Sequence, residues 1–374
     1  MNSKKIFLYG VIIFGLSMIF SSQTGAKTYR VKDIKTITTY GKSLDWSNTK
    51  NLIASAAMQK DGYYDIFVME PDGSNKQCLT CRRQGVPQKH NGNPVWHPSG
   101  EYIVFTAEKK NNLAKYKEWA IPGTGFNCDL WVMTSDGQHF YQLTDYPLKQ
   151  PFRAVIHPQF SHDGKKLFWA ERVKQGKSFG GGWLLKIADF VVDNKTIRLE
   201  NIEAYSPGEW SCFYESHAFS KDNKKVLFSG NLKAGQISVG LDIYEFNLET
   251  QQLKRLTHSN SDWDEHAHHS PDGTKIAWMS STGLNIKWGD DISGHKWGRY
   301  LKTELWMMDV DGSDKQRLTF LNTPGHQEYM GGARGIVSDS TWSPDGKSIA
   351  ALVAHEAPGG KLKTKIVMIT LEKD

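Results

Sequence analysis

The chain has 374 residues, of which 39% are hydrophobic and 23% are charged, and its formal net charge is +6. This length accommodates one large all-β domain or two ordinary domains, because sandwiches, barrels and propellers often exceed the usual domain size. The charge would fall to +4 (6 − 2) if Lys4 and Lys5 were removed with a leader, and so mild an excess excludes nucleic acid as an expected partner.

The first residues have the composition of a secretory signal. Lys4 and Lys5 precede an uncharged apolar stretch from Ile6 to Phe20, and the small residues Thr24-Gly25-Ala26 follow. The stretch is shorter than the roughly 20 residues that span a bilayer, which argues against the alternative of an uncleaved anchor. We therefore predict a signal peptide over residues 1–26, a single domain over residues 27–374, no stable membrane span, and a periplasmic or secreted location.

The chain, which we expect to be exported, has four cysteines, at Cys78, Cys81, Cys128 and Cys212. An oxidising compartment favours one or two disulfides, and the sequence does not choose among the three possible pairings. Cys78-Leu-Thr-Cys81 could also be a redox pair or half of a zinc site. Because there is no second CxxC and no βαβ context, a structural role is favoured.

A repeated pattern dominates the rest of the chain. An aromatic residue or His is followed by a turn of the Ser-Pro-Asp-Gly type and then by a β run. The copies begin at Trp96, Phe160, Phe219, His269 and Trp342, with a degenerate sixth at Trp46. A second apolar strand, a third strand such as Asp129–Met133, a tight turn and a fourth strand follow. The tight turn often contains Asp-Gly, and the fourth strand ends in Leu-Thr in four of the units. Six repeats of four antiparallel strands predict an all-β, six-bladed β-propeller.

The two ends of the chain are predicted to close the ring. The last unit contains only three strands, ending near Lys365–Thr370, whereas Lys35–Thr39 stands unassigned before the first unit. We expect the N-terminal strand to supply the outer strand of blade six, since an open ring would leave exposed strand edges.

Long insertions are predicted between the second and third strands of several blades. They cover residues 109–127, 172–182, 283–302 and 355–363, on the face that also carries the links between blades. Their aromatic residues and lysines suit a sugar or a protein partner, although they could instead fold back as a satellite core. The ligand-binding candidates are Trp119, Trp288, Trp297, Arg153 and Arg334. The two arginines could meet an acidic ligand, or could form ion pairs with Asp339 or Glu215.

Histidines gather at the inner strands and the links on this same face. The metal-binding candidates are His157, His217, His266 and His268, and Glu215, Glu265 or Gln327 could complete the shell. His266 and His268 alternate on one strand and should point to the same side. The two further histidines expected on this face are His90 and His326. The alternative is that all these imidazoles make hydrogen bonds between blades.

The repeat resembles that of the TolB-like β-propeller family, also called the PD40 or WD40-like repeat, over about residues 44–370. The resemblance implies the propeller fold. It does not narrow the range of activities much, because propellers of this kind have many functions. The α/β domain that precedes the propeller in TolB has no counterpart between Ala26 and Leu44. Related propellers that cleave oligogalacturonate hold a metal through His and Gln near the channel.

Two functions remain open at this level, and whether the protein is an enzyme is undecided. The favoured one is an exported binding or scaffold module, expected to be a monomer, that recognises a glycan or an envelope protein through the face that carries the insertions. The alternative is a lyase or hydrolase for acidic oligosaccharides, with one divalent transition metal at the channel mouth. No P-loop or dinucleotide motif is present, and Gly176-Lys-Ser-Phe-Gly180 lies in a loop rather than at a nucleophile elbow.

Overall fold

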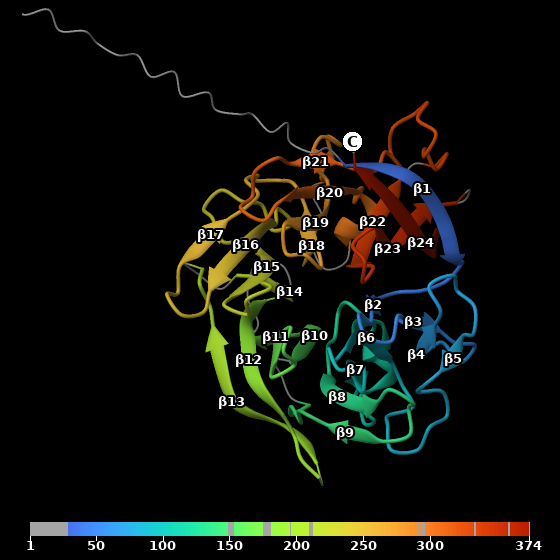
Figure 1. Cartoon of the computed structure of the whole chain (residues 1–374), viewed down its shortest axis with the longest axis vertical. Coiled ribbons are helices and arrows are strands. Elements are labelled where there is room, and N and C mark those ends of the chain that lie inside the picture. Colours follow the sequence, from blue (N-terminus) through green and yellow to red (C-terminus); the bar gives the residue numbers. More distant parts are fainter. Residues whose placement is uncertain are drawn as a thin grey trace, which may run out of the picture.

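The computed structural model describes residues 29–148, 153–174, 181–194, 196–208, 212–289, 292, 296–332, 334–357 and 360–373. Its strands form six antiparallel sheets of four strands each, arranged around a central axis (Figure 1). The predicted all-β, six-bladed propeller is therefore confirmed. The predicted signal peptide and the motif Gly176–Gly180 lie outside the described residues.

The blades follow one another along the chain, each from its innermost to its outermost strand, except that β1 supplies the outermost strand of blade six. Blade one contains β2 (Leu44–Trp46), β3 (Ile53–Met58), β4 (Tyr64–Met69) and β5 (Gln77–Cys78). Blade two contains β6 (Asn91–Trp96), β7 (Tyr102–Glu108), β8 (Cys128–Thr134) and β9 (Phe140–Gln142). Blade three contains β10 (Ala154–Phe160), β11 (Lys166–Lys174), β12 (Gly182–Val192) and β13 (Ile197–Tyr205). Blade four contains β14 (Tyr214–Phe219), β15 (Lys225–Gly230), β16 (Asp242–Asn247) and β17 (Leu253–Arg255). Blade five contains β18 (Asp264–His269), β19 (Lys275–Ser280), β20 (Glu304–Asp309) and β21 (Gln316–Arg317). Blade six contains β22 (Gly335–Trp342), β23 (Ser348–Glu356), β24 (Leu362–Lys373) and β1 (Tyr29–Thr38).

The Ser-x-Asp-Gly turn joins the first and second strands of a blade through local hydrogen bonds. In blade three, Ser161 Oγ donates to Asp163 Oδ1 at 2.7 Å and accepts from the backbone N–H of Lys166 at 2.9 Å. Gly164 adopts a φ of 72°, which glycine tolerates without steric cost. Blade six has the equivalent hydrogen bond, in which Ser343 Oγ donates to Asp345 Oδ1 at 2.7 Å. The repeat therefore encodes a turn that needs only residues within five positions of one another.

The Leu-Thr signature that follows the outer strand in blades one, two, four and five has an equally local role. In blade four, Thr257 Oγ1 accepts from the backbone N–H of Ile243 at 2.9 Å and donates to Asp242 Oδ1 at 3.1 Å. Blade five makes the same pair of bonds with Thr319, Leu305 and Glu304. Because these groups are buried, the threonine fixes the outer strand against the third strand where the backbone ladder is short.

The ring closes as predicted, through the N-terminal strand. β1 pairs antiparallel with β24 from Tyr29 opposite Lys373 to Thr38 opposite Ile366, which is a longer strand than the predicted Lys35–Thr39. Figure 1 shows β1 in blue along β24 in dark red. The six inner strands contact their neighbours all the way round, including β2 with both β6 and β22.

The hydrophobic core lies between neighbouring blades. Leu167 and Trp169 of blade three, for example, pack with Val104 and Leu130 of blade two, and all four side chains are fully buried. Helix is restricted, in the part of the chain that is described, to the 3-10 segments η1 (Ala114–Trp119) and η2 (Lys296–Arg299), and no helix there is long and apolar enough to cross a membrane.

Two of the predicted insertions are shorter than expected. β11 continues to Lys174, and β23 continues to Glu356, so that strand pairing extends into the segments that the sequence indicated as loops. The insertions of blades two and five are the long ones, and each contains one of the 3-10 segments.

Candidate functional site

The insertions of blades two and five border a cavity of about 290 Å³ at one mouth of the channel. Its walls are aromatic, and its floor is polar. The aromatic wall consists of Trp119, Phe126, Trp183, Phe213, Trp263 and Trp297. The polar floor consists of Lys42, Ser43, Asn93, His157, Glu215, Glu265, His266, Ser338 and Asp339. A concave apolar site with a few convergent polar groups is the usual form of a small-molecule site.

The aromatic wall is held by packing between elements that are distant in sequence. Trp263, directly before β18, stacks on Trp297 of η2 with ring centroids 4.2 Å apart and planes at 29°. Trp119 of η1 meets Phe126 edge to face at 5.7 Å, and its side chain is 45% exposed. Two segments of the insertions thus present flat rings to the same cavity.

Five of the nine residues of the polar floor stand at one repeated position, three residues before the aromatic or His that starts each turn. The six residues at this position are Ser43, Asn93, His157, Ser216, His266 and Asp339, and all except Ser216 line the cavity. In blades two, three, five and six the pairing between the inner strand and the second strand shifts at this position. Two residues of the inner strand there lie opposite a single residue of the second strand. Such a β-bulge re-aims a side chain out of the regular alternation.

The bulges place three of these residues in the left-handed region. The φ angles of Asn93, His157 and His266 are 48°, 48° and 52°. Asn and His tolerate this region better than most residues, and such conformations cluster at functional sites. The two histidines are therefore turned into the cavity by the backbone.

A compact group of possible ligands lies at the floor. His157 Nε2 lies 3.3 Å from Glu215 Oε1, and His266 Nε2 lies 3.7 Å from the same oxygen. The potential ligand atoms of these three residues all lie within 4.8 Å of one another. His266 Nδ1 faces Asp339 Oδ1 at 3.7 Å. All four residues are buried.

Burial controls the charge of this group. Desolvation lowers the pKa of His157 to about 3 and the pKa of His266 well below its ordinary value, so that both imidazoles are neutral at physiological pH. Desolvation also raises the pKa of Glu215 well above its usual range, with Glu265 and Asp339 adding to the effect. The floor therefore combines neutral imidazole nitrogens with a carboxyl group, Glu215, whose charged form burial disfavours.

The structure brings the four predicted metal histidines close together, but not into one site. Ring centroids lie 5.0 Å apart for His157 and His266, 5.7 Å for His217 and His266, and 6.4 Å for His217 and His268. His217 Nε2 pairs with Ser229 Oγ at 2.9 Å. His268 lines a second cavity of about 140 Å³, which is bordered by the Ser-x-Asp-Gly turns of the opposite face.

The bulge explains why His266 and His268 separate. The register jumps between Glu265 and His268, which breaks the alternation that would have put both side chains on one side. The remaining histidines of the sequence analysis lie away from the floor. His90 packs against Tyr63 and Tyr64. His326 packs on Phe320, and Gln327 lines a groove beside β1.

The five predicted ligand-binding residues divide in the same way. Trp119 and Trp297 line the cavity, whereas Trp288 packs behind Trp263 and donates through Nε1 to Ser261 O at 2.9 Å. Arg153 and Arg334 are engaged in ion pairs.

These two ion pairs have partners that the sequence analysis did not name. Arg153 Nη1 lies 2.7 Å from Glu171 Oε1, and Arg334 Nε lies 3.0 Å from Glu356 Oε2. Neither partner is the expected Asp339 or Glu215. Arg334 also donates to Gly298 O, and so ties blade six to η2, the segment that contains Trp297.

Sequence reasoning missed several cavity residues, notably Lys42, Trp183, Phe213 and Trp263. Lys42 adjoins the repeated floor position, so that an alignment of the blades on their turns would have found it. Phe213 and Trp263 both stand six residues before the turn of their blade, but the other blades place no common residue type there. Trp183 carries no such signal, since it reaches the cavity from β12.

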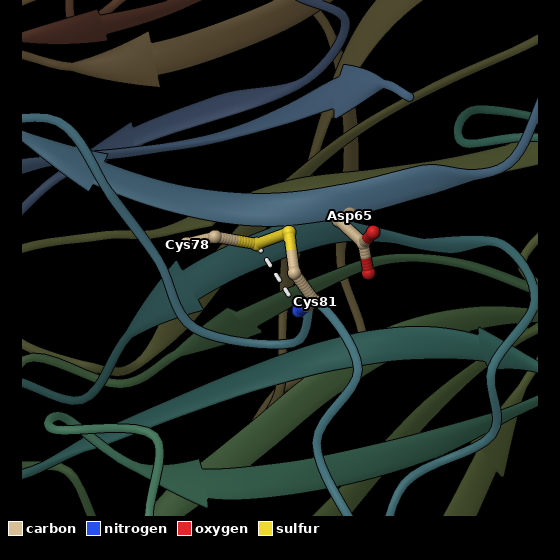
Figure 2. Close-up of side chains that lie close together, drawn as sticks. All are labelled: Asp65, Cys78 and Cys81. Carbon is tan, nitrogen blue, oxygen red and sulfur yellow. Dashed lines mark hydrogen bonds between the residues drawn. A yellow bond between two sulfur atoms is a disulfide. The ribbon is translucent and has the colours of Figure 1, made fainter. Parts of the chain in front are cut away.

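The cysteines form one disulfide, between Cys78 and Cys81, at the end of β5 (Figure 2). Asp65 lies beside it, and the N–H of Cys81 donates to Cys78 Sγ at 3.1 Å. In this form neither sulfur is a thiolate, so that the pair offers no zinc ligands. Cys128 and Cys212 are buried thiols, and burial raises the pKa of Cys128 well above its ordinary value.

No protein-family model matches the chain, and no curated protein does. Among solved structures, the propeller is similar to that of TolB from Acinetobacter baumannii, with a TM-score of 0.51 and 14% identity over 87% of this chain and 67% of that one. It is also similar to a putative TolB from Agrobacterium tumefaciens, with a TM-score of 0.50 and 14% identity over 92% of this chain and 99% of that one. These similarities show that the chain has a TolB-like propeller fold.

Proposed function

We propose that this propeller is a binding module that holds a glycan in the aromatic-walled cavity, outside the cytoplasm. The observation that carries the proposal is the combination of flat Trp and Phe rings on the wall with hydrogen-bonding groups on the floor. Sugars have apolar ring faces and polar edges, and this combination of surfaces suits both.

The size of the cavity limits the ligand. A volume of about 290 Å³ is near the lower end of the range for small-molecule sites, roughly 300–1,000 Å³. We therefore expect the cavity to accept one or two terminal sugar rings, with the rest of the glycan on the insertions around it. Trp119 suits this position, because it lines the cavity and is also 45% exposed.

The extracytoplasmic location rests on two features. Residues 1–26 have the pattern of a secretory signal. The Cys78–Cys81 disulfide is favoured in an oxidising compartment and is rare among proteins of the cytosol.

Binding is favoured over the lyase or hydrolase alternative because the two predicted carboxylate anchors are engaged elsewhere. Arg153 and Arg334 are held in ion pairs and do not line the cavity. Lys42 and the imidazoles of His157 and His266 do line it, so a test for turnover has to accompany the test for binding. The envelope-protein alternative has less support among the described residues, because the aromatic side chains of the insertions are gathered there in a small concave site.

Tryptophan fluorescence and calorimetry test the proposal, with a panel of neutral and acidic mono- and disaccharides. We expect at least one saccharide to bind, and Trp119→Ala to weaken its binding about tenfold, since stacking on one ring contributes roughly 0.5–1.5 kcal/mol beyond area burial. Tyr40→Ala is the matched control, because Tyr40 is 51% exposed and lies outside the cavity. The proposal is wrong if no saccharide binds, or if both variants weaken binding equally. Release of unsaturated sugar products would favour the lyase.

A further inference from the structure

We infer that His157, Glu215 and His266 bind one divalent transition metal ion, of the zinc(II) type, at the floor of the cavity. Each histidine would ligate through Nε2 and the glutamate through Oε1. The three ligands come from the inner strands β10, β14 and β18 of three successive blades.

The spacing of the three atoms suits such an ion. Bonds of roughly 2.0–2.1 Å at tetrahedral angles put two ligand atoms roughly 3.3–3.4 Å apart. Glu215 Oε1 lies 3.3 Å from His157 Nε2 and 3.7 Å from His266 Nε2. These two separations lie within a few tenths of an ångström of that value, and the ligand atoms of the two histidines lie within 4.8 Å of each other.

The hydrogen bonding of the group also calls for a further partner. Among the described residues, Glu215 Oε1 and His266 Nδ1 are buried and have no hydrogen-bond partner. Glu215 is only 5% exposed. A buried carboxylate oxygen without a partner is costly, and a cation bound between Glu215 and the two imidazoles would satisfy it.

A second carboxylate faces the other ring nitrogen of one of the imidazoles. Asp339 Oδ1 lies 3.7 Å from His266 Nδ1, and Asp339 Oδ2 is fixed by the backbone N–H of Leu44 at 3.0 Å. A proton on Nδ1 directed at Asp339 leaves the lone pair of Nε2 for the metal. Metal-bound histidines commonly have such a carboxylate behind them.

Three protein ligands leave one coordination position toward the cavity. Structural zinc sites use four protein ligands, whereas sites that act on a ligand keep one position open. We expect this position to take a carboxylate or hydroxyl oxygen of the bound saccharide, which favours acidic sugars. This last step rests on the proposed glycan binding, while the metal site itself does not.

Calorimetric titration of the chelator-treated full chain with Zn²⁺ tests the site, together with the visible absorption of added Co²⁺. We expect one ion per chain and a Co²⁺ spectrum typical of nitrogen and oxygen ligands. Since loss of a group behind a ligand already costs 10–100-fold in affinity, loss of a ligand should cost at least about 100-fold.

The variants are chosen to preserve the bulges. His157→Asn and His266→Asn retain a residue that accepts the left-handed φ, as Asn93 does at the same position of blade two. Glu215→Gln keeps the volume and removes the charge. His268→Asn is the matched control, because His268 lies on the same strand as His266 but lines the other cavity.

Three results would overturn the metal site: no stoichiometric ion in the folded wild-type protein, undiminished affinity in the folded Glu215→Gln variant, or an equal loss in His268→Asn. A saccharide that binds equally with and without Zn²⁺ would overturn only the role of the open position. One Zn²⁺ per chain without any saccharide binding would contradict the proposed function and leave the metal site standing.

Discussion

The threonine that fixes the outer strand of blade five allows a quantitative test of how the repeat stabilises the fold. Thr319 is fully buried, and its Oγ1 accepts from Leu305 N at 2.9 Å and donates to Glu304 Oε2 at 2.7 Å. Thr319→Val keeps the shape of the side chain and removes both hydrogen bonds. The substitution leaves the buried N–H of Leu305 without its acceptor and removes one hydrogen-bond donor from the buried carboxylate of Glu304.

The expected loss follows from these two bonds. An unsatisfied buried group costs roughly 1–3 kcal/mol, and a hydrogen bond to a charged group contributes roughly 1.5–3 kcal/mol. Glu304 Oε2 keeps the N–H of Leu321 at 3.0 Å, which reduces the second contribution. We expect the free energy of unfolding to fall by about 3 kcal/mol.

Urea denaturation followed by tryptophan fluorescence measures this loss, with Thr319→Ser as the control. Serine keeps the hydroxyl and loses one methyl group, so that its loss should be about 1 kcal/mol. If valine destabilises the protein no more than serine does, the hydroxyl has no structural role. The assignment of Leu-Thr as a structural signature would then be refuted.

Three further predictions concern ring closure, pH and the disulfide. Removing residues 29–38 exposes the edge of β24, so we expect a lower melting temperature and self-association in size-exclusion chromatography; a monomer of unchanged stability would contradict closure by β1. Burial, with a smaller effect from Lys117, lowers the pKa of His90 to about 4, below the ordinary value of about 6.5. The unfolded chain therefore takes up this proton first, and the free energy of unfolding should fall between pH 6.5 and 4, by on the order of 2 kcal/mol at pH 5. His90→Gln should flatten this part of the measured profile, and an unchanged profile would exclude His90 as its source. Reducing the Cys78–Cys81 disulfide should lower the free energy of unfolding, measured by urea denaturation, by about 2 kcal/mol, because the loop that it closes is short. A much larger decrease would indicate that the disulfide stabilises structure beyond this loop.

The number and the closure of the blades could be predicted from the sequence, because the signals for them are local. Ser161, Asp163 and Lys166 form their turn within five residues, and the same turn recurs in blade six. The hydrogen bonds of Thr257 join it to Asp242, fifteen residues away in the same blade. Each such signal acts inside one blade and is independent of how the blades meet.

The candidate site was only partly predictable, because it depends on contacts between blades. His157 and His266 stood out as residue types in the sequence, and Glu215 was named as a possible third ligand. Their separations of 3.3 and 3.7 Å exist only because three inner strands converge at the axis of the closed ring.

The amino-acid sequence by itself thus determined the repeated turn, the number of strands in each blade and the strand that closes the ring. Tertiary structure decided which histidines share a site. The bulge between Glu265 and His268 turns His266 into one cavity and leaves His268 in the other. One extra residue in a strand reverses the direction of those that follow, and its effect appears only when the strand is paired with its neighbour.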